Sequence, residues 1–273
     1  MVEAGHEIPL VVTQPDRPAG RGLRTLGSAV KLAAQELGLD AYQPERIKDP
    51  AAVDRIREAG SDLHVVVAYG QIIPPQLLAV PRLGTVNVHA SLLPRHRGAA
   101  PIVWAILSGD SQTGVTIMQM DAGLDTGPIL AQEATLIAPD ETARTLESRL
   151  AERGADLLLT TLPRLANGTL RPVPQPAEGA TYARRLTSED GKLDQGTMSA
   201  QELDRRVRAL TPQPGCWLTV DGIPIKVLAG HVADGRAETG LAAVTVDGTY
   251  IVDEVQPPGG RPMSAAAWAR GRR

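Results

Sequence analysis

The first half of the chain alternates short aliphatic runs with longer stretches in which apolar residues recur at helical spacing. Short β-branched runs predict strands, and the helical spacing predicts helices between them. The expected strands are residues 8–13, 62–68, 85–89 and 115–120, and the expected helices are residues 27–37, 51–59 and 138–158. This alternation is typical of parallel strands joined by crossover helices, so we expect an α/β doubly wound sheet.

The second half has a different pattern. Pro and Gly accumulate between residues 163 and 176, with an Asn167-Gly168 turn signal, which predicts a linker. One helical stretch and several short runs separated by Gly and Asp then predict a small β-barrel. The helix is expected at residues 199–209 and the strands at 216–220, 223–228, 241–246 and 249–252. The domains are therefore expected at 1–165 and 185–273, joined by a linker at 166–184.

The composition of the chain limits which kinds of partner the protein can bind. The net charge of -3 excludes a surface that is basic throughout, so any RNA contact must be local. The lone Cys216 cannot form an internal disulfide, and no Cys/His cluster has zinc spacing, so we expect a cytoplasmic protein without a metal. No apolar run reaches the roughly 20 residues that span a bilayer, and we expect no membrane partner. Aromatic residues make up only 3% of the chain, so stacking on bases is not expected to dominate.

The most informative stretch runs from Asn87 to Gly98, with the sequence NVHASLLPRHRG. Alternate side chains of a strand face the same way, so Asn87 and His89 would project together near its carboxyl end, where open α/β sheets place their sites. An amide and an imidazole there can donate hydrogen bonds to one developing oxyanion. The alternative is that Asn87 caps a turn and that His89 is a satisfied core residue.

A second stretch, MQMDAGLDTGP at residues 118–128, contains Asp125 between two glycines. The glycines permit a tight loop that could bring the carboxylate to His89, where it would favour the imidazolium and accept a proton or hydrogen bond from an attacking amine. Taken alone, Asp-Thr-Gly is also an ordinary turn.

A third stretch is a Pro/Gly loop, TQPDRPAGRGLR at residues 13–24. It holds Arg17, Arg21 and Arg24 within a short span, which suits bidentate contacts to phosphate. A solvated surface loop is the alternative.

Together these stretches resemble the folate-dependent formyltransferase family, and the arginine loop with the attached barrel resembles its methionyl-tRNA members. The resemblance also includes VVVAYG at residues 65–70 and the stretches at 214–226 and 256–265, so it covers nearly the whole chain. It implies a Rossmann-like formyltransferase domain followed by an OB-like β-barrel. It further implies transfer of the formyl group of 10-formyltetrahydrofolate to the α-amino group of methionyl initiator tRNA, by a cytoplasmic monomer.

The resemblance also implies roles for individual residues. The family's catalytic trio matches Asn87, His89 and Asp125. Its folate-binding residues match Ser91, Leu92, Leu93 and Pro94, with Tyr69 and Gly70 in the wall that receives the pterin ring. Arg21 matches the arginine that enters the tRNA acceptor arm, with Arg17 and Arg24 beside it.

The sequence departs from the family pattern in two places. Three alternative functions also stay open. The chain begins with VEAGH at residues 2–6, which is typical of the end of a helix, so we expect the family's opening strand, its Gly-Thr-Pro turn and most of its first helix to be missing. The barrel is shortened between residues 232 and 248. The alternatives are formyl transfer to another amine, on a sugar nucleotide or glycinamide ribonucleotide, hydrolysis of 10-formyltetrahydrofolate, and a catalytically inactive binder of folate or RNA.

Overall fold

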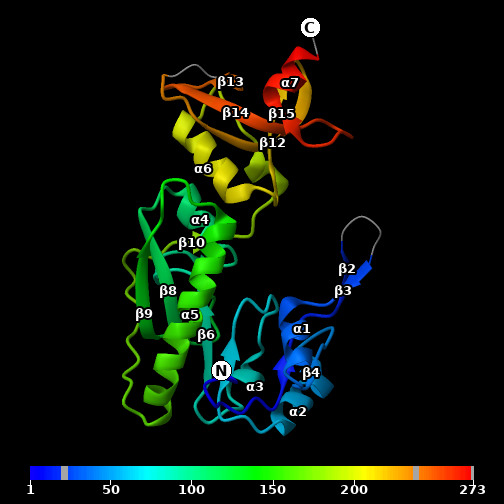
Figure 1. Cartoon of the computed structure of the whole chain (residues 1–273). Helices are drawn as coiled ribbons and strands as arrows, with labels where there is room; N and C mark the ends of the chain where they lie inside the picture. The colour runs from blue at the N-terminus through cyan, green and yellow to red at the C-terminus, as the bar shows by residue number, and fades with distance from the viewer. Residues whose placement is uncertain (20–23, 236–239, 272–273) are drawn as a thin grey trace. The chain divides into compact units, whose positions relative to one another are not determined.

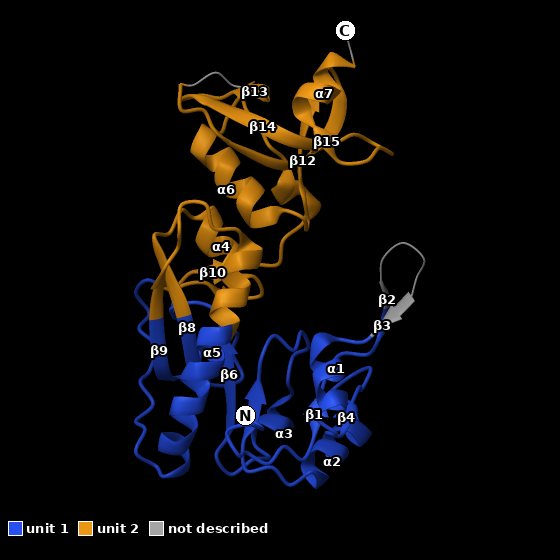
Figure 2. Ribbon diagram, viewed as in Figure 1, with its two compact units in different colours: residues 1–94, 115–133, 152–179 blue, residues 95–114, 134–151, 180–273 orange. Residues whose placement is uncertain are grey.

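The structure is a computed structural model that describes residues 1–19, 24–235 and 240–271 (Figure 1). The chain divides into two compact units (Figure 2). The first unit contains residues 1–94, 115–133 and 152–179, and the second contains residues 95–114, 134–151 and 180–273. Both units are therefore built from segments that are distant in the sequence.

The main sheet has the strand order β5-β6-β8-β9. Its strands are β5 (His64–Val66), β6 (Thr85–His89), β8 (Gln112–Gln119) and β9 (Ile129–Leu136). The expected strand at 85–89 is confirmed, and β5 pairs parallel with β6. The expectation of parallel strands is wrong for β8, which pairs antiparallel with β6 so that His89 lies opposite Thr116. The chain re-enters the sheet at the end where β6 leaves it, and neighbours connected in that way must run antiparallel.

Helix α5 (Ala143–Ala166) packs part of its length against this sheet. A methyl group added at Gly154 would lie 2.9 Å from Cγ1 of Val88 and 3.4 Å from Cγ1 of Val115. Glycine therefore allows the helix to approach β6 and β8 closely. Val115, Ile117 and Met118 of β8 are almost fully buried, which fixes the position of β6 and of the side chains at its carboxyl end.

The remainder of the first unit surrounds a smaller apolar core. Strand β1 (Val11–Val12) pairs parallel with β4 (Ala41–Tyr42) in a separate two-stranded sheet, so only two residues of the expected strand at 8–13 are extended. The expected helices are confirmed as α1 (Ala29–Glu36), capped by the Ser28 hydroxyl, and α2 (Pro50–Glu58), with Pro50 in its first turn. Helix α3 (Pro75–Leu78) and the hairpin of β2 (Arg17–Ala19) with β3 (Arg24–Leu26) complete this part.

The second unit carries an antiparallel sheet of order β11-β12-β14-β13, with β15 also paired to β14. Its strands are β11 (Cys216–Val220), β12 (Ile223–Val232), β13 (Leu241–Val244), β14 (Thr249–Gln256) and β15 (Met263–Ser264). Helix α6 (Ala200–Leu210) begins with a Ser199/Glu202 capping box and buries Leu203 and Val207. The sequence thus predicts β11 to β14 and α6 but not β15, and the OB-like barrel stays a prediction.

The second unit also contains four short elements that the sequence analysis did not predict. They are β7 (Arg97–Gly98), which pairs parallel with β10 (Tyr182–Ala183), and the helices α4 (Pro101–Leu107) and α7 (Ala265–Arg270). A 3-10 turn at Ser188–Gly191 is capped by Thr187 and Asp190.

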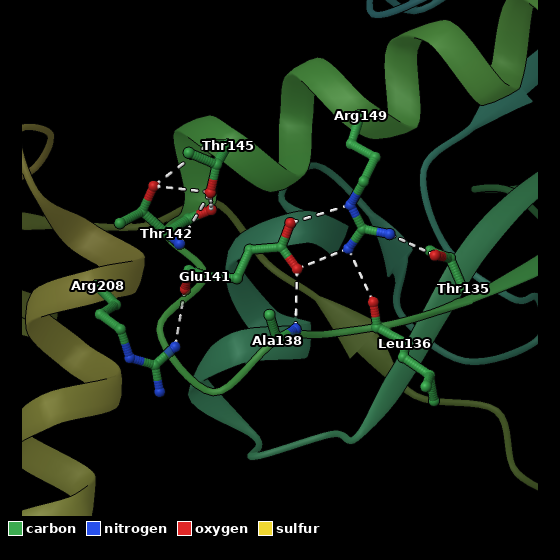
Figure 3. Close-up of polar contacts among 8 residues, drawn as sticks. All are labelled: Thr135, Leu136, Ala138, Glu141, Thr142, Thr145, Arg149 and Arg208. Atoms are coloured by element: carbon green, nitrogen blue, oxygen red, sulfur yellow. Dashed lines mark hydrogen bonds and ion pairs between the residues drawn. The ribbon is translucent and has the colours of Figure 1, made fainter.

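A buried carboxylate organises the start of α5 (Figure 3). The Glu141 side chain accepts hydrogen bonds from Nε of Arg149 at 3.1 Å, from Nη2 of Arg149 at 2.6 Å and from the Ala138 backbone at 3.1 Å. Arg149 also donates to the Leu136 carbonyl at 2.8 Å and to the Thr135 hydroxyl. Arg208 of α6 donates to the Glu141 carbonyl at 2.8 Å, which joins α6 to this turn within the second unit.

Candidate active site

Asn87 and His89 lie at the carboxyl end of β6, two residues apart and therefore on the same face. Asn87 is half-buried, while His89 is only 5% exposed. Strand β8 on one side and β5 on the other fix the backbone of β6, so these two side chains emerge from a rigid element.

Asp125 reaches this pair from the loop that follows β8. Its Oδ1 accepts a hydrogen bond from Nδ2 of Asn87 at 3.2 Å, and its Oδ2 lies 3.8 Å from Nδ1 of His89. The carboxylate is 13% exposed. The structure therefore brings the three residues of the expected catalytic trio together. Their catalytic roles stay predictions.

The loop that carries Asp125 is held by its own residues. The Asp121 carboxylate accepts from the Gly123 backbone at 2.9 Å and from the Thr126 hydroxyl at 2.8 Å. A methyl group added at Gly127 would lie 1.9 Å from the Gln119 carbonyl, so only glycine fits where the loop returns to β8. The Asp-Thr-Gly turn is thus real, and it also delivers a carboxylate to the end of β6.

Gln175, in the expected linker, contacts this loop and was missed by the sequence analysis. Its side-chain Nε2 donates to the Asp125 carbonyl at 2.9 Å and to the Gly127 carbonyl at 2.7 Å. Two residues earlier, Val173 exchanges backbone hydrogen bonds of 2.8 Å with Ile129 at the start of β9. The segment at 173–175 is therefore attached to the loop, and no local sequence pattern indicates a contact across 50 residues.

The residues expected to bind folate follow β6. The Thr116 hydroxyl donates to the Ser91 carbonyl at 2.7 Å and accepts from the Leu93 backbone at 3.1 Å. Nε2 of Gln132 donates to the Leu93 carbonyl and to the Thr116 hydroxyl, both at 2.9 Å. Ser91 and Leu93 are buried, whereas Leu92 and Pro94 are half-buried. Thr116 and Gln132 thus shape this loop, a role that the sequence analysis missed.

The segment after β5 was expected to form the wall of the folate site. The Tyr69 ring packs against the apolar cluster of Ile47, Val53, Ile56 and Leu77, and burial raises the pKa of the Tyr69 hydroxyl. Gly70 follows with a positive φ of 84°. Two apolar side chains of this segment face outward, because Val67 is 58% and Ile72 is 92% exposed.

Two of the three expected tRNA-contacting arginines, Arg17 and Arg24, belong to the β2–β3 hairpin. Arg17 opens β2 and is exposed, Arg24 opens β3, and Arg21 lies outside the described residues. Asp16 at the base of the hairpin forms an ion pair with Lys31 and accepts from Nε2 of Gln43 at 2.7 Å. These hydrogen bonds, first from Lys31 and then from Gln43, lower the pKa of Asp16. The hairpin is thus anchored at its base.

The described part of the chain, residues 1–19, 24–235 and 240–271, contains neither a metal-binding cluster nor a membrane-spanning helix. Within these ranges, no group of three or more His, Cys, Asp or Glu side chains could hold a metal ion. No helix in the same ranges is both long and apolar enough to cross a membrane.

The chain matches two protein-family models over most of its length. The formyl transferase model matches residues 2–162, and the model of the formyl transferase C-terminal domain matches residues 185–273. The methionyl-tRNA formyltransferase of Halorhodospira halophila is 51% identical, and that of Thiobacillus denitrificans is 46% identical. Each alignment covers 100% of this chain and 91% of the relative.

Solved structures with lower identity share the fold. HypX from Aquifex aeolicus in complex with tetrahydrofolic acid is 17% identical, with a TM-score of 0.66 over 88% of this chain and 44% of that one. The N-formyltransferase from Helicobacter canadensis, in complex with folinic acid and dTDP-3-aminofucose, is 18% identical, with a TM-score of 0.66 over 92% of this chain and 93% of that one. The full-length identity to the curated relatives and the two family models show that this chain belongs to the methionyl-tRNA formyltransferase family.

Proposed function

We propose that this chain transfers the formyl group of 10-formyltetrahydrofolate to the α-amino group of methionyl initiator tRNA. One observation carries the chemistry: an amide, an imidazole and a carboxylate converge at the carboxyl end of β6. The Halorhodospira and Thiobacillus relatives, which match along the whole chain, support methionyl-tRNA as the acceptor.

Asn87 supplies one donor for the reaction. Its Nδ2 carries two hydrogens, and the contact with Asp125 uses one of them. The other can donate to the formyl oxygen as negative charge develops there during attack by the amine. Because β6 holds the amide in place beforehand, little reorganisation is needed in the transition state.

His89 and Asp125 supply the second donor and the proton acceptor. Protonated His89 stabilises the same oxygen, and the Asp125 carboxylate orients the imidazole and accepts the proton that the amine loses as it bonds to the formyl carbon. The bond from the formyl carbon to N10 of the folate then breaks, N10 takes up that proton, and tetrahydrofolate leaves. The 3.8 Å between Asp125 Oδ2 and His89 Nδ1 is longer than a hydrogen bond. Catalytic contacts of this kind often shorten when substrate binds.

The chain also offers a surface that fits a folate. The outward-facing Val67 and Ile72 present apolar area that a flat ring system would cover, and they flank the Tyr69-Gly70 pair. In the 91–94 loop, Thr116 and Gln132 bind the Ser91 carbonyl and the backbone N–H and carbonyl of Leu93. The bound folate would supply the formyl group, and these two segments would hold it beside Asn87.

For the tRNA we propose the arginines at 17, 21 and 24 as contacts to the acceptor arm. We further propose the domain boundaries at 1–165 and 185–273, with an OB-like C-terminal domain as a second RNA surface. The matches of the two family models to residues 2–162 and 185–273 support this division.

The test is an assay of the purified chain with 10-formyltetrahydrofolate and charged initiator tRNA, followed by the same assay of His89→Ala. We expect formylmethionyl-tRNA from the unchanged chain and a loss of about 100-fold to 1000-fold in the variant, which is typical for removal of one oxyanion donor. Charged elongator methionine tRNA serves as the acceptor control.

Each other outcome identifies a different function. Formate release without any acceptor would indicate a hydrolase, and formylation of a sugar-nucleotide amine or of glycinamide ribonucleotide would indicate a different acceptor. Binding of folate or tRNA without turnover would indicate an inactive binder. Any of these results, in the absence of formylmethionyl-tRNA, would reject the proposal.

A further inference from the structure

The Asp125 carboxylate depends on a left-handed backbone conformation, which Asp adopts more readily than most residues but at a cost relative to Gly. Asp125 has a positive φ of 53°, in the left-handed region that residues with a side chain adopt at a cost. This conformation turns the carboxylate toward Asn87 and His89. Hydrogen bonds to the backbone of the turn stabilise it in this conformation.

Gln175 provides two of these hydrogen bonds through a single atom. Its Nε2 donates to the carbonyl of Asp125 and to the carbonyl of Gly127, so one amide group joins both sides of Thr126. Gln175 is half-buried in a segment whose neighbours at 171–174 and 176–179 are exposed. The burial is thus specific to the residue that contacts the loop.

The segment around Gln175 is itself fixed. Val173 and Ile129 exchange two backbone hydrogen bonds of 2.8 Å, so Val173 is joined to the first residue of β9 in an isolated bridge. Gly127 lies so close to the Gln119 carbonyl that an added methyl group would clash with it. The turn at 125–127 is therefore held between β8 and the 173–175 segment.

We infer that Gln175 is a positioning residue for formyl transfer, whose side-chain amide holds the 125–127 turn so that the Asp125 carboxylate faces Asn87 and His89. Gln175 acts through Asp125 and does not itself contact the reacting atoms. This inference rests on the proposed function, because it assumes that Asp125 takes part in the transfer.

The decisive substitution keeps the size of the side chain and removes its donors. Met has nearly the length of Gln and no hydrogen to donate, so Gln175→Met preserves packing while both carbonyls lose the hydrogen bond from position 175. Gln175→Glu is an isosteric second variant. Its ionised carboxylate only accepts hydrogen bonds, so it would face two carbonyl oxygens without a donor. Gln35→Met, on the exposed side of α1, is the matched control for the same chemical change.

In steady-state assays with charged initiator tRNA, we expect Gln175→Met to lower kcat by about 10-fold to 100-fold, since a misplacement of about 1 Å can cost 100-fold. The KM values for 10-formyltetrahydrofolate and for tRNA should stay within about 2-fold, because the role proposed for Gln175 is to hold the turn and not to bind either substrate. Gln175→Glu should lose at least as much, and Gln35→Met should match the unchanged chain.

A double-mutant cycle separates positioning from general destabilisation. In an Asp125→Ala background, measured in single-turnover assays, Gln175→Met should have no further effect, because the group that it positions is gone. A residue that only stabilised the fold would reduce activity by the same factor in both backgrounds. Urea unfolding of each variant, followed by circular dichroism, checks that the proteins compared are folded.

The inference is overturned if Gln175→Met keeps the kcat of the unchanged chain, or if its effect is the same with and without the Asp125 carboxylate. Either result would leave the proposed function standing, because the unchanged chain would still transfer formyl groups. Absence of transfer by the unchanged chain would instead reject the proposed function, and with it the inference.

Discussion

The side-chain amide of Asn87 donates a 3.2 Å hydrogen bond to the carboxylate of Asp125, 38 residues later in the chain. The contact joins a rigid strand to a loop, and it uses one of the two hydrogens that the amide carries. The amide group itself, and not just the size of the side chain, is therefore needed at position 87.

Replacing Asn87 by Asp tests this requirement. Asn87→Asp removes both donors and places a second carboxylate next to Asp125, where two like charges repel. We expect a loss of kcat at neutral pH at least as large as that of Asn87→Ala, itself about 100-fold to 1000-fold. Single-turnover formylation assays measure both. An Asn87→Asp enzyme within 10-fold of the unchanged rate would show that the amide donor is dispensable.

Arg17 tests the proposed RNA contact. It is exposed on β2, so Arg17→Ala is expected to leave the fold unchanged and to remove one phosphate contact. Binding of initiator tRNA should weaken, and the slope of log affinity against log salt should fall by about 1. Filter binding at several salt concentrations measures this slope. Transfer to a small amine such as a methionine ester should be unaffected, and equal losses on both acceptors would argue against an RNA contact.

The sequence predicted the elements with strong local patterns and missed those that depend on distant partners. The strands at 85–89 and 216–220 were found with their observed bounds, because β-branched or aromatic residues make up most of each. Strand β9 was missed because it lies at the edge of the sheet. Alternate residues along it, such as Gln132 and Ala134, are exposed, so its sequence shows only a weak alternation of apolar and polar residues. The direction of β8 was wrong because pairing direction depends on the connection and not on the pattern.

In the candidate site, too, the sequence predicted what a local pattern specifies and missed what depends on distant partners. Period-two alternation was enough to place Asn87 and His89 on one face of β6. The distance from Asp125 to these residues depends on a positive φ, on Gly127 and on donors from Gln175, none of which a local motif specifies. Thr116 and Gln132, which shape the 91–94 loop, are likewise ordinary strand residues in the sequence.

The contacts of Asp110 should make the free energy of unfolding depend on pH. Burial alone would raise its pKa, but hydrogen bonds from Arg95 and then from His96 outweigh burial and lower the pKa below the ordinary value. A lowered folded-state pKa gives stability that is present above the unfolded pKa of about 4 and lost as pH falls through the folded value. Asp110→Asn should therefore cost about 1–2 kcal/mol at pH 7, discounted because Arg95 is partly exposed. Urea titrations should show this difference shrinking below pH 4, and a constant difference would contradict it.

The thiol of Cys216 should react slowly with thiol-specific reagents. The side chain is 1% exposed, and burial raises the pKa of the thiol to about 12. At pH 8 only about one thiol in ten thousand is then ionised, and the thiolate is the reactive form. Ellman's reagent should label the single cysteine only when the surrounding sheet opens, at a rate that rises steeply with urea. Complete labelling within seconds in native buffer would show that the thiol is accessible.

Substitutions of Glu141 and Arg149 should have coupled effects on the free energy of unfolding. The Glu141 side chain is 7% exposed and receives two hydrogen bonds from Arg149, so Arg149→Met would leave a buried carboxylate without its partner. Such a loss typically costs about 3–5 kcal/mol, and we expect the lower end because Arg149 is itself partly exposed. Glu141→Gln removes the charge but keeps the backbone carbonyl that Arg208 binds, so the double variant should be more stable than Arg149→Met alone. Urea unfolding of the two single variants and the double variant gives the coupling energy. Additive losses would show that the two side chains stabilise the start of α5 independently.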